Sequence, residues 1–302
     1  MSASPRLAAL AEGLVVVLIF GSTLALAKAA LAYLGPLTLS ALRYCLAALL
    51  LHPLAARRAS PARWPTRLWK RFLFIGLSFY VVGNGAVFLG LRYLPATTTT
   101  LLLNLIPIVV LVAGIVWLGE APTRVQLAGV AVGLAGGALF FSPGFKAGEP
   151  LGIAIVTVGL VGNAMFGIVG RGIARERSAD TLSLTAIPLA VGGAIMLPLA
   201  LAVEGVPRSP AAGWGIVLWL AVVNTACAYL LYNHALRVLA ALEMSMLLNL
   251  TPLVTALLAW AFLGERLGVV QLIGMVVVIA GVALVQWGRR APKAASADGG
   301  EP

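Results

Sequence analysis

The chain of 302 residues is 61% hydrophobic and only 10% charged, and its mean hydropathy is +1.02. Soluble domains carry about 25% charged residues, so this composition excludes a soluble globular protein and predicts an integral membrane protein. The formal net charge of +11 would suit a nucleic-acid-binding protein. The sequence has no recognition motif and no basic patch interleaved with aromatic residues, so we expect no nucleic-acid partner.

Ten apolar runs follow one another along the chain. Each is close to the ~20 residues that a helix needs to cross ~30 Å of hydrocarbon. The runs cover residues 13–32, 37–55, 72–91, 97–118, 125–142, 151–170, 181–203, 213–235, 242–263 and 269–287. The sequence therefore predicts an all-α polytopic membrane protein with ten transmembrane helices.

The first run has a second interpretation as a secretory signal. Arg6 precedes it, and Ala25-Leu26-Ala27 resembles a small-residue cleavage site. The run is too long for a signal peptide and nine further runs follow it, so we expect it to stay as the first helix.

The basic residues are divided unequally between the two sides of the predicted membrane. If the N-terminus is cytoplasmic, that side carries 15 Lys and Arg residues and the other side carries 4, with 2 left inside the spans. The positive-inside rule then places both termini in the cytoplasm, in a protein of the inner or plasma membrane.

An internal repeat divides the chain into two halves. Residues 96–140 align without gaps with residues 241–285 at 19 identities in 45, and the octets TLLLNLIP (100–107) and SMLLNLTP (245–252) lie within this match. Five spans in each half force the second half to enter the membrane from the opposite side, which predicts inverted repeats around a central cavity. The expected regions are a cytoplasmic N-terminus (1–12), the first repeat (13–143), the inverted second repeat (144–288) and a cytoplasmic disordered tail (289–302).

These features together resemble the EamA-type exporters of the drug/metabolite transporter superfamily. The first span carries FGSTLALAK, the fourth and ninth carry LNLxP and end in LGE, and the fifth and tenth are rich in glycine. The resemblance covers residues 13–287 and implies a basket of helices that works by alternating access. It implies export of small metabolites, with amino acids, including aromatic ones, as the expected substrates. A carrier of drugs, sugars or nucleotide sugars is the alternative within the superfamily.

The polar residues of the two octets are candidates for the cavity. A proline inside a helix removes one hydrogen bond and crowds the carbonyl four residues earlier, so each octet predicts a hinge whose freed carbonyls need partners. The asparagines either face a watery cavity or only join neighbouring helices. Each set shares one helix face: Thr100, Asn104 and Pro107 in the fourth span, and Ser245, Asn249 and Pro252 in the ninth.

Amides that share a helix with aromatic residues form a second group of cavity candidates. Amide and phenol groups beside apolar ring faces suit a zwitterionic amino acid with a variable side chain. The candidates are Tyr80 with Asn84, Asn163 with Phe166, and Asn224 with Tyr229 and Tyr232.

A few charged residues lie within or next to the spans. Lys28 and Arg43 can serve as partners for a substrate carboxylate, but both lie toward the outer ends of their helices, and we expect them to snorkel to the membrane surface. Glu120 and Glu265 each follow a glycine at the end of a helix, and we expect them to be turn residues that cap the next helix.

The sequence lacks the motifs of the common enzyme classes. It has no GxxxxGK[ST], HExxH or GxSxG and only two histidines, so we expect no catalytic residue, no metal site and no cofactor. The expected partners are a small-molecule substrate and the lipid bilayer. A polytopic membrane enzyme and a channel are the alternatives from other functional classes.

Overall fold

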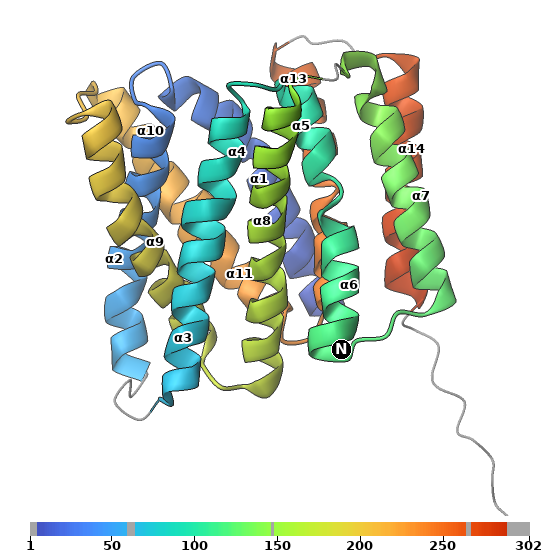
Figure 1. Cartoon of the computed structure of the whole chain (residues 1–302), viewed down its shortest axis with the longest axis horizontal. Helices are drawn as coiled ribbons and strands as arrows, with labels where there is room; N and C mark the ends of the chain where they lie inside the picture. Colours follow the sequence, from blue (N-terminus) through green and yellow to red (C-terminus); the bar gives the residue numbers. More distant parts are fainter. Residues whose placement is uncertain (1–4, 59–63, 146–147, 264–266, 289–302) are drawn as a thin grey trace, which may run out of the picture.

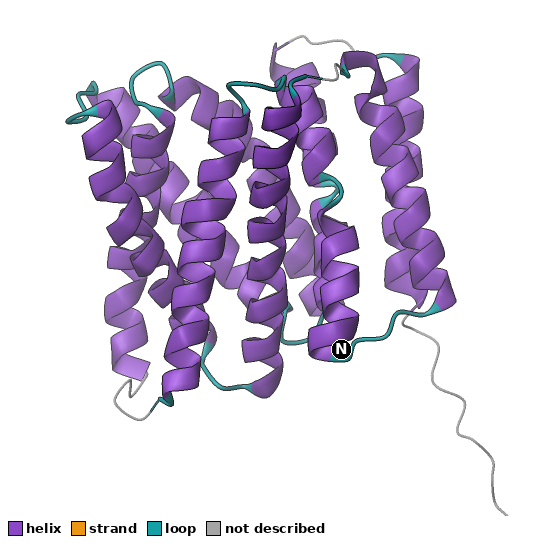
Figure 2. Ribbon diagram, in the orientation of Figure 1, coloured by secondary structure: helices purple, strands orange, loops and turns teal. Residues whose placement is uncertain are grey.

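The computed structural model describes residues 5–58, 64–145, 148–263 and 267–288. All regular secondary structure in these ranges is helical (Figure 2). Ten stretches of the described chain are long and apolar enough to cross a membrane, as the ten apolar runs predicted. Glu265 and the tail 289–302 lie outside the described residues, and so does the side chain of Lys28.

The helices of the first half pack mainly against helices of the second half, so the two halves form one bundle (Figure 1). Two spans are composite: the third contains a π-helical segment, η2, and the fourth is broken between α5 and α6. The helices of this half are α1 (Pro5–Ala30), α2 (Pro36–Arg58), α3 (Thr66–Ile75), η2 (Gly76–Gly83), α4 (Asn84–Gly90), α5 (Ala96–Leu103), α6 (Ile106–Leu118) and α7 (Arg124–Phe141).

The second half repeats this order after a short 3-10 turn, η3 (Ser142–Gly144). Its helices are α8 (Pro150–Glu176), α9 (Thr181–Glu204), α10 (Ala211–Ala221), η4 (Val222–Cys227), α11 (Ala228–Ala235), α12 (Ala241–Leu248), α13 (Thr251–Leu263) and α14 (Val269–Gly288). The offset of 145 residues seen in the octets also relates the first residues of α1 and α8, of α5 and α12, and of α7 and α14. The π-helical segment and the helix break recur in the corresponding spans.

The two halves run in opposite directions through the bundle. The helix α1 begins and α14 ends at the lower end of Figure 1, which we call the terminal end, whereas α8 begins at the upper, opposite end. The equivalent helices α2 and α9 pack against each other, as do α7 and α14. The predicted inverted repeats are therefore confirmed.

The helix α1 begins earlier than the apolar run predicted. The run starts at residue 13, but the helix starts at Pro5. Its first two turns carry Arg6 and Glu12, whose partners Glu243 and His234 lie in the second half at 2.7 and 2.9 Å. An apolar run predicts only the part of a helix that lies in the hydrocarbon of the bilayer. Ion pairs and residues with high helix propensity extend the helix beyond that part.

Glycines hold α7 and α14 in backbone contact, as the glycine-rich fifth and tenth spans suggested. A Cβ atom at Gly281 would meet the backbone of Gly129 and Gly133, and one at Gly274 would come 2.6 Å from the amide nitrogen of Phe140. Small residues let two helices approach closely enough for dispersion contacts to replace the missing hydrophobic driving force in lipid.

We expect Gly281→Ala to destabilise the folded protein by about 1–3 kcal/mol, because the new methyl group has only backbone to displace. Gly215→Ala is the matched control: no atom lies within 4 Å of its Cβ position, so it should stay within about 1 kcal/mol of the native chain, on the stabilising side. Thermal unfolding in detergent micelles measures both. Equal midpoints for the two variants would contradict the close backbone contact.

Candidate functional site

A cavity of about 730 Å³ lies between the two halves. This volume is within the roughly 300–1,000 Å³ typical of small-molecule sites. Residues of both halves line it, from Gly167 and Tyr232 at mid-depth to Ser40 and Thr97 near the opposite end of the bundle. The cavity therefore extends toward the end that does not carry the termini.

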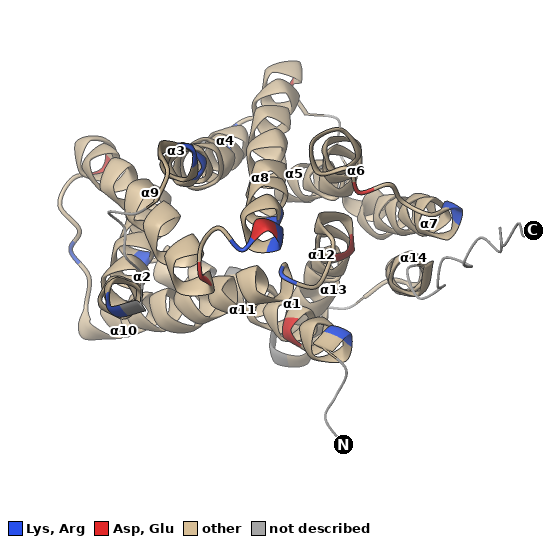
Figure 3. Ribbon diagram, turned by 90° about the horizontal axis from the view of Figure 1, so that it is seen from below, with Lys and Arg blue, Asp and Glu red and all other residues tan. Residues whose placement is uncertain are grey.

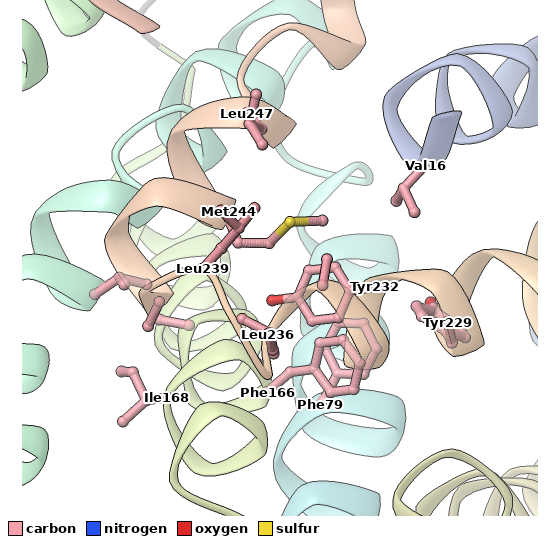
Figure 4. Close-up of a cluster of buried hydrophobic side chains, with 14 of the residues drawn as sticks. Val16, Phe79, Phe166, Ile168, Tyr229, Tyr232, Leu236, Leu239, Met244 and Leu247 are labelled. Atoms are coloured by element: carbon pink, nitrogen blue, oxygen red, sulfur yellow. The ribbon is translucent and has the colours of Figure 1, made fainter. Parts of the chain in front are cut away.

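Aromatic rings form the deepest wall of the cavity. The ring of Phe166 stacks on Phe79 at 4.3 Å and on Tyr232 at 4.8 Å, and Tyr229 meets Phe166 edge-on at 5.4 Å (Figure 4). Phe20 of α1 meets Tyr229 at 5.5 Å. These separations are those of favourable aromatic pairs, so the wall is a preformed apolar surface built by both halves.

The two broken spans meet beside the cavity. Each helix is interrupted at its asparagine, over residues 104–105 and 249–250, and the amide of Ile108 donates to Leu105 instead of to Asn104. The carbonyl of Asn104 instead accepts a hydrogen bond of 3.3 Å from the side-chain amide of Asn249. Because an unpaired carbonyl in hydrocarbon is costly, this bond stabilises the break.

Most of the candidate residues lie in the cavity wall. Those in the wall are Asn84, Thr100, Asn104, Asn163, Phe166, Tyr229, Tyr232, Ser245, Asn249 and Pro252. Three candidates are placed elsewhere: Tyr80, Asn224 and Pro107.

Tyr80 lies behind the wall. Its side chain is fully buried, and its ring packs edge-on against Tyr44 at 4.8 Å and against Gly192 of α9. In the π-helical segment η2 the side chain that lines the cavity is that of Phe79, and the Asn84 side chain donates to the Phe79 carbonyl at 2.9 Å.

Asn224 joins two helices instead of facing the cavity. Its buried side-chain nitrogen lies 2.7 Å from the Ile19 carbonyl, 3.1 Å from Ser22 Oγ and 2.9 Å from Thr23 Oγ1. These contacts tie η4 to α1. Pro107, the remaining candidate, is buried in the first turn of α6. Backbone N–H groups in the first turn have no hydrogen-bond acceptor within the helix, so the missing N–H of proline costs no helical hydrogen bond.

Arg43 differs from the expectation that it snorkels to the surface. It lines the cavity, and its Nε donates to Thr225 Oγ1 at 3.2 Å. Sequence reasoning also missed Phe20, Tyr44 and Phe79, which line the cavity as well. Apolar ring faces inside an apolar span carry no sequence signal that separates a cavity wall from a lipid-facing surface.

Charged side chains join the two halves at the terminal end of the bundle. Seen from that end, charged residues lie at the ends of α8 and α12 (Figure 3). Three ion pairs and one contact between an imidazole and a carboxylate each join a residue of the first half to one of the second. The ion pairs are Arg6 with Glu243, Arg71 with Glu176, and Glu120 with Arg171, and the fourth contact is that of Glu12 with His234. Among the described residues, no ion pair lies at the opposite end.

The Glu120–Arg171 pair is the most enclosed of these contacts on both sides. The side chains are 13% and 7% exposed, and the closest atoms are 2.8 Å apart. Arg171 also donates to the Leu236 carbonyl, while the second oxygen of Glu120 accepts from the backbone amide of Ala241. Glu120 was expected to cap the next helix of its own half, but the helix that it caps is α12 of the other half.

Comparisons with known proteins agree with this architecture. A model of the EamA-like transporter family matches residues 8–142 and 150–287. The uncharacterized transporter YyaM of Bacillus subtilis is 26% identical over 90% of this chain and 92% of its own length. Protein PecM of Dickeya dadantii is 26% identical over 75% of each chain.

Two further matches bear on the fold and on function. A protein of Streptantibioticus cattleyicolor, named a probable terminal-alkyne amino-acid exporter, is 26% identical over 64% of this chain and 65% of its own. A protein crystal structure matches with a TM-score of 0.81 over 95% of this chain and all of that one, at 19% identity. At this identity the match shows the fold alone.

Because Asn224 connects two helices outside the cavity, we expect Asn224→Ala to destabilise the protein by about 1 kcal/mol without changing the affinity for ligands of the cavity. Tyr80→Phe is the control, because the buried Tyr80 hydroxyl has no hydrogen-bond partner among the described residues. Removal of this hydroxyl should therefore not lower the free energy of unfolding. Thermal unfolding and ligand titration measure the two effects. An Asn224→Ala protein with native stability and weakened binding would contradict the structural role.

Proposed function

This chain belongs to the EamA-like transporter family, and on that premise we propose that it exports small metabolites by alternating access, with amino acids, including aromatic ones, as substrates. The observation that carries this proposal is the cavity between the inverted halves, lined by rings and amides. Inverted repeats place the substrate of secondary transporters near mid-membrane at their interface.

The chemistry of the cavity wall supports an amino acid as the substrate. The rings of Phe79, Phe166 and Tyr232 offer apolar faces to a side chain, while amides such as Asn84 and Asn163 offer donors and acceptors to a polar backbone. The printed name of the Streptantibioticus relative points to an amino-acid substrate for that protein. Described lining residues include only one charged side chain, Arg43, which fits an amino acid better than a phosphate-bearing nucleotide sugar.

The ion pairs at the terminal end support alternating access. The cavity runs toward the opposite end, and the pairs join the halves at the end that carries the termini. The excess of Lys and Arg on the terminal side favours a cytoplasmic location for that end in the inner or plasma membrane. In this orientation the pairs would separate the cavity from the cytoplasm, and we infer that loading of substrate requires them to separate.

We expect the purified protein in liposomes to carry labelled phenylalanine with saturable kinetics. Phe166→Leu should raise the concentration for half-maximal flux about 2–10-fold, because an aromatic pair contributes about 0.5–1.5 kcal/mol. The control is Phe72→Leu, which changes an equally buried ring at the terminal end, outside the cavity. Flux equal to that of empty vesicles for every amino acid would remove the substrate assignment, and flux that never saturates would favour a channel.

The double variant Glu120→Gln, Arg171→Gln should favour opening of the terminal end, because both charges of an enclosed pair are neutralised together and neither is left buried alone. A single cysteine at Ser245, in a chain whose Cys45 and Cys227 are changed to Ser, reports that opening. Ser245 is 6% exposed and lines the cavity. An impermeant maleimide added on the terminal side should label this cysteine several-fold faster in the double variant.

The matched control for this experiment is the double variant Arg71→Gln, Glu176→Gln. Its side chains are 23% and 49% exposed, and exposed pairs contribute only about 0–1 kcal/mol. Labelling should stay near that of the parent. Equal labelling rates in all three proteins would show that the enclosed pair does not hold this end closed.

A further inference from the structure

Arg43 carries a charge in the wall of a cavity inside the membrane. It lies about two turns into α2, roughly 10 Å along the helix from its first residue at a rise of 1.5 Å per residue. Its side chain is half-buried and forms none of the ion pairs among the described residues. The described lining of the cavity contains no Asp or Glu.

The guanidinium group is held in place by Thr225. The Thr225 hydroxyl donates its only proton to the Leu220 carbonyl at 2.9 Å, so its oxygen acts as the acceptor for Arg43 Nε at 3.2 Å. Thr225 is fully buried within η4. The two terminal nitrogens of Arg43 have no hydrogen-bond partner among the described residues, and they form the edge that binds carboxylates.

An unpaired guanidinium inside a membrane is costly and normally marks a functional site. Its planar fork binds a carboxylate through two parallel hydrogen bonds. Since the described lining offers no acid, the anion has to come from solution. A carboxylate that enters the cavity satisfies the open edge of Arg43 and leaves the rest of its molecule against the aromatic wall.

The charge is present on only one side of the pseudo-two-fold axis. The residue 145 positions after Arg43 is Pro188 of α9, which carries no charge. One unpaired positive charge matches one carboxylate. It disfavours an organic cation, and a doubly charged phosphate would remain only half neutralised.

We propose that Arg43, oriented by Thr225, binds the carboxylate of the transported molecule, which makes monocarboxylates with an apolar or aromatic side chain the substrate class. The inference rests on the proposed transport function and names the chemical group that the cavity selects. Because the described lining supplies no acid for an ammonium group, the carboxylate is the required group and the amine is not.

Competition for phenylalanine flux in liposomes tests this selection. Two probes each lack one group of phenylalanine: 3-phenylpropanoate keeps the carboxylate and lacks the amine, and phenylalaninamide keeps the amine and lacks the carboxylate. We expect 3-phenylpropanoate to compete at least ten-fold more strongly than phenylalaninamide. Equal competition by the two probes would overturn the proposal.

Variants of Arg43 and Thr225 test the residues themselves. We expect Arg43→Gln to raise the half-saturating concentration of phenylalanine at least ten-fold and to abolish the preference for 3-phenylpropanoate. Arg43→Lys should retain part of the preference, and Thr225→Val should weaken it several-fold, so the test survives if one variant fails to fold. The control is Arg208→Gln, which changes an exposed arginine in the loop 205–210 at the end opposite the termini. This variant should leave the half-saturating concentration of phenylalanine and the preference for 3-phenylpropanoate unchanged. An unchanged preference in Arg43→Gln would refute the role of this residue.

A binding measurement separates this inference from the proposed transport function. Thermal unfolding of the purified protein should shift upward with 3-phenylpropanoate, because a ligand that binds only the folded state stabilises it. The shift should be absent in Arg43→Gln and with phenylalaninamide. Binding of 3-phenylpropanoate without phenylalanine flux would refute the transport assignment and support the carboxylate site. Phenylalanine flux without a preference for the carboxylate would refute the carboxylate site and support the transport assignment.

Discussion

A broken helix inside a membrane has to satisfy its own backbone, and this constraint shapes the centre of the molecule. The breaks at Asn104 and Asn249 leave carbonyls without helical partners in a region where no lipid can donate a hydrogen bond. The bond from the Asn249 side chain to the Asn104 carbonyl joins the two breaks. The same residues line the cavity, so the polarity that repairs the backbone also provides a polar surface for a ligand.

The two halves are related by symmetry in their helices but not in their charges. Most helix starts and both breaks recur at an offset of 145 residues, and the π-helical segments recur within one residue of it. Arg43 has no charged counterpart, and the ion pairs between the halves gather at the terminal end. A symmetric scaffold gives two ends of similar shape, and the unsymmetric charges decide which end is closed and how a polar ligand is oriented.

The sequence was sufficient for the fold because two of its signals are independent of side-chain contacts. The thickness of a bilayer determines the length of an apolar run, and the duplication leaves matched motifs such as those around Pro107 and Pro252. The direction of individual side chains was harder to predict. In lipid, the outer face of a helix is as apolar as the inner face, so periodicity does not identify the cavity.

Local distortion and long-range pairing account for most of the remaining differences. In the π-helical segment of the third span Phe79 lines the cavity, whereas the candidate Tyr80 lies behind the cavity wall. The partners Glu120 and Arg171 are 51 residues apart, and Arg6 and Glu243 are 237 apart. No pattern in the chain links such residues, because their proximity depends on how the two halves come together.

The glycine contact between α7 and α14 has a mechanical consequence. A Cβ atom at Gly281 would meet backbone atoms of Gly129 and Gly133, so no side chain separates the two helices there. The side chain of Val285 also lies against Gly129, and the Gln126 side chain donates to the Val285 carbonyl. We therefore expect α7 and α14 to move as one unit, so that any rocking of the halves occurs at their other contacts, such as the ion pairs of the terminal end.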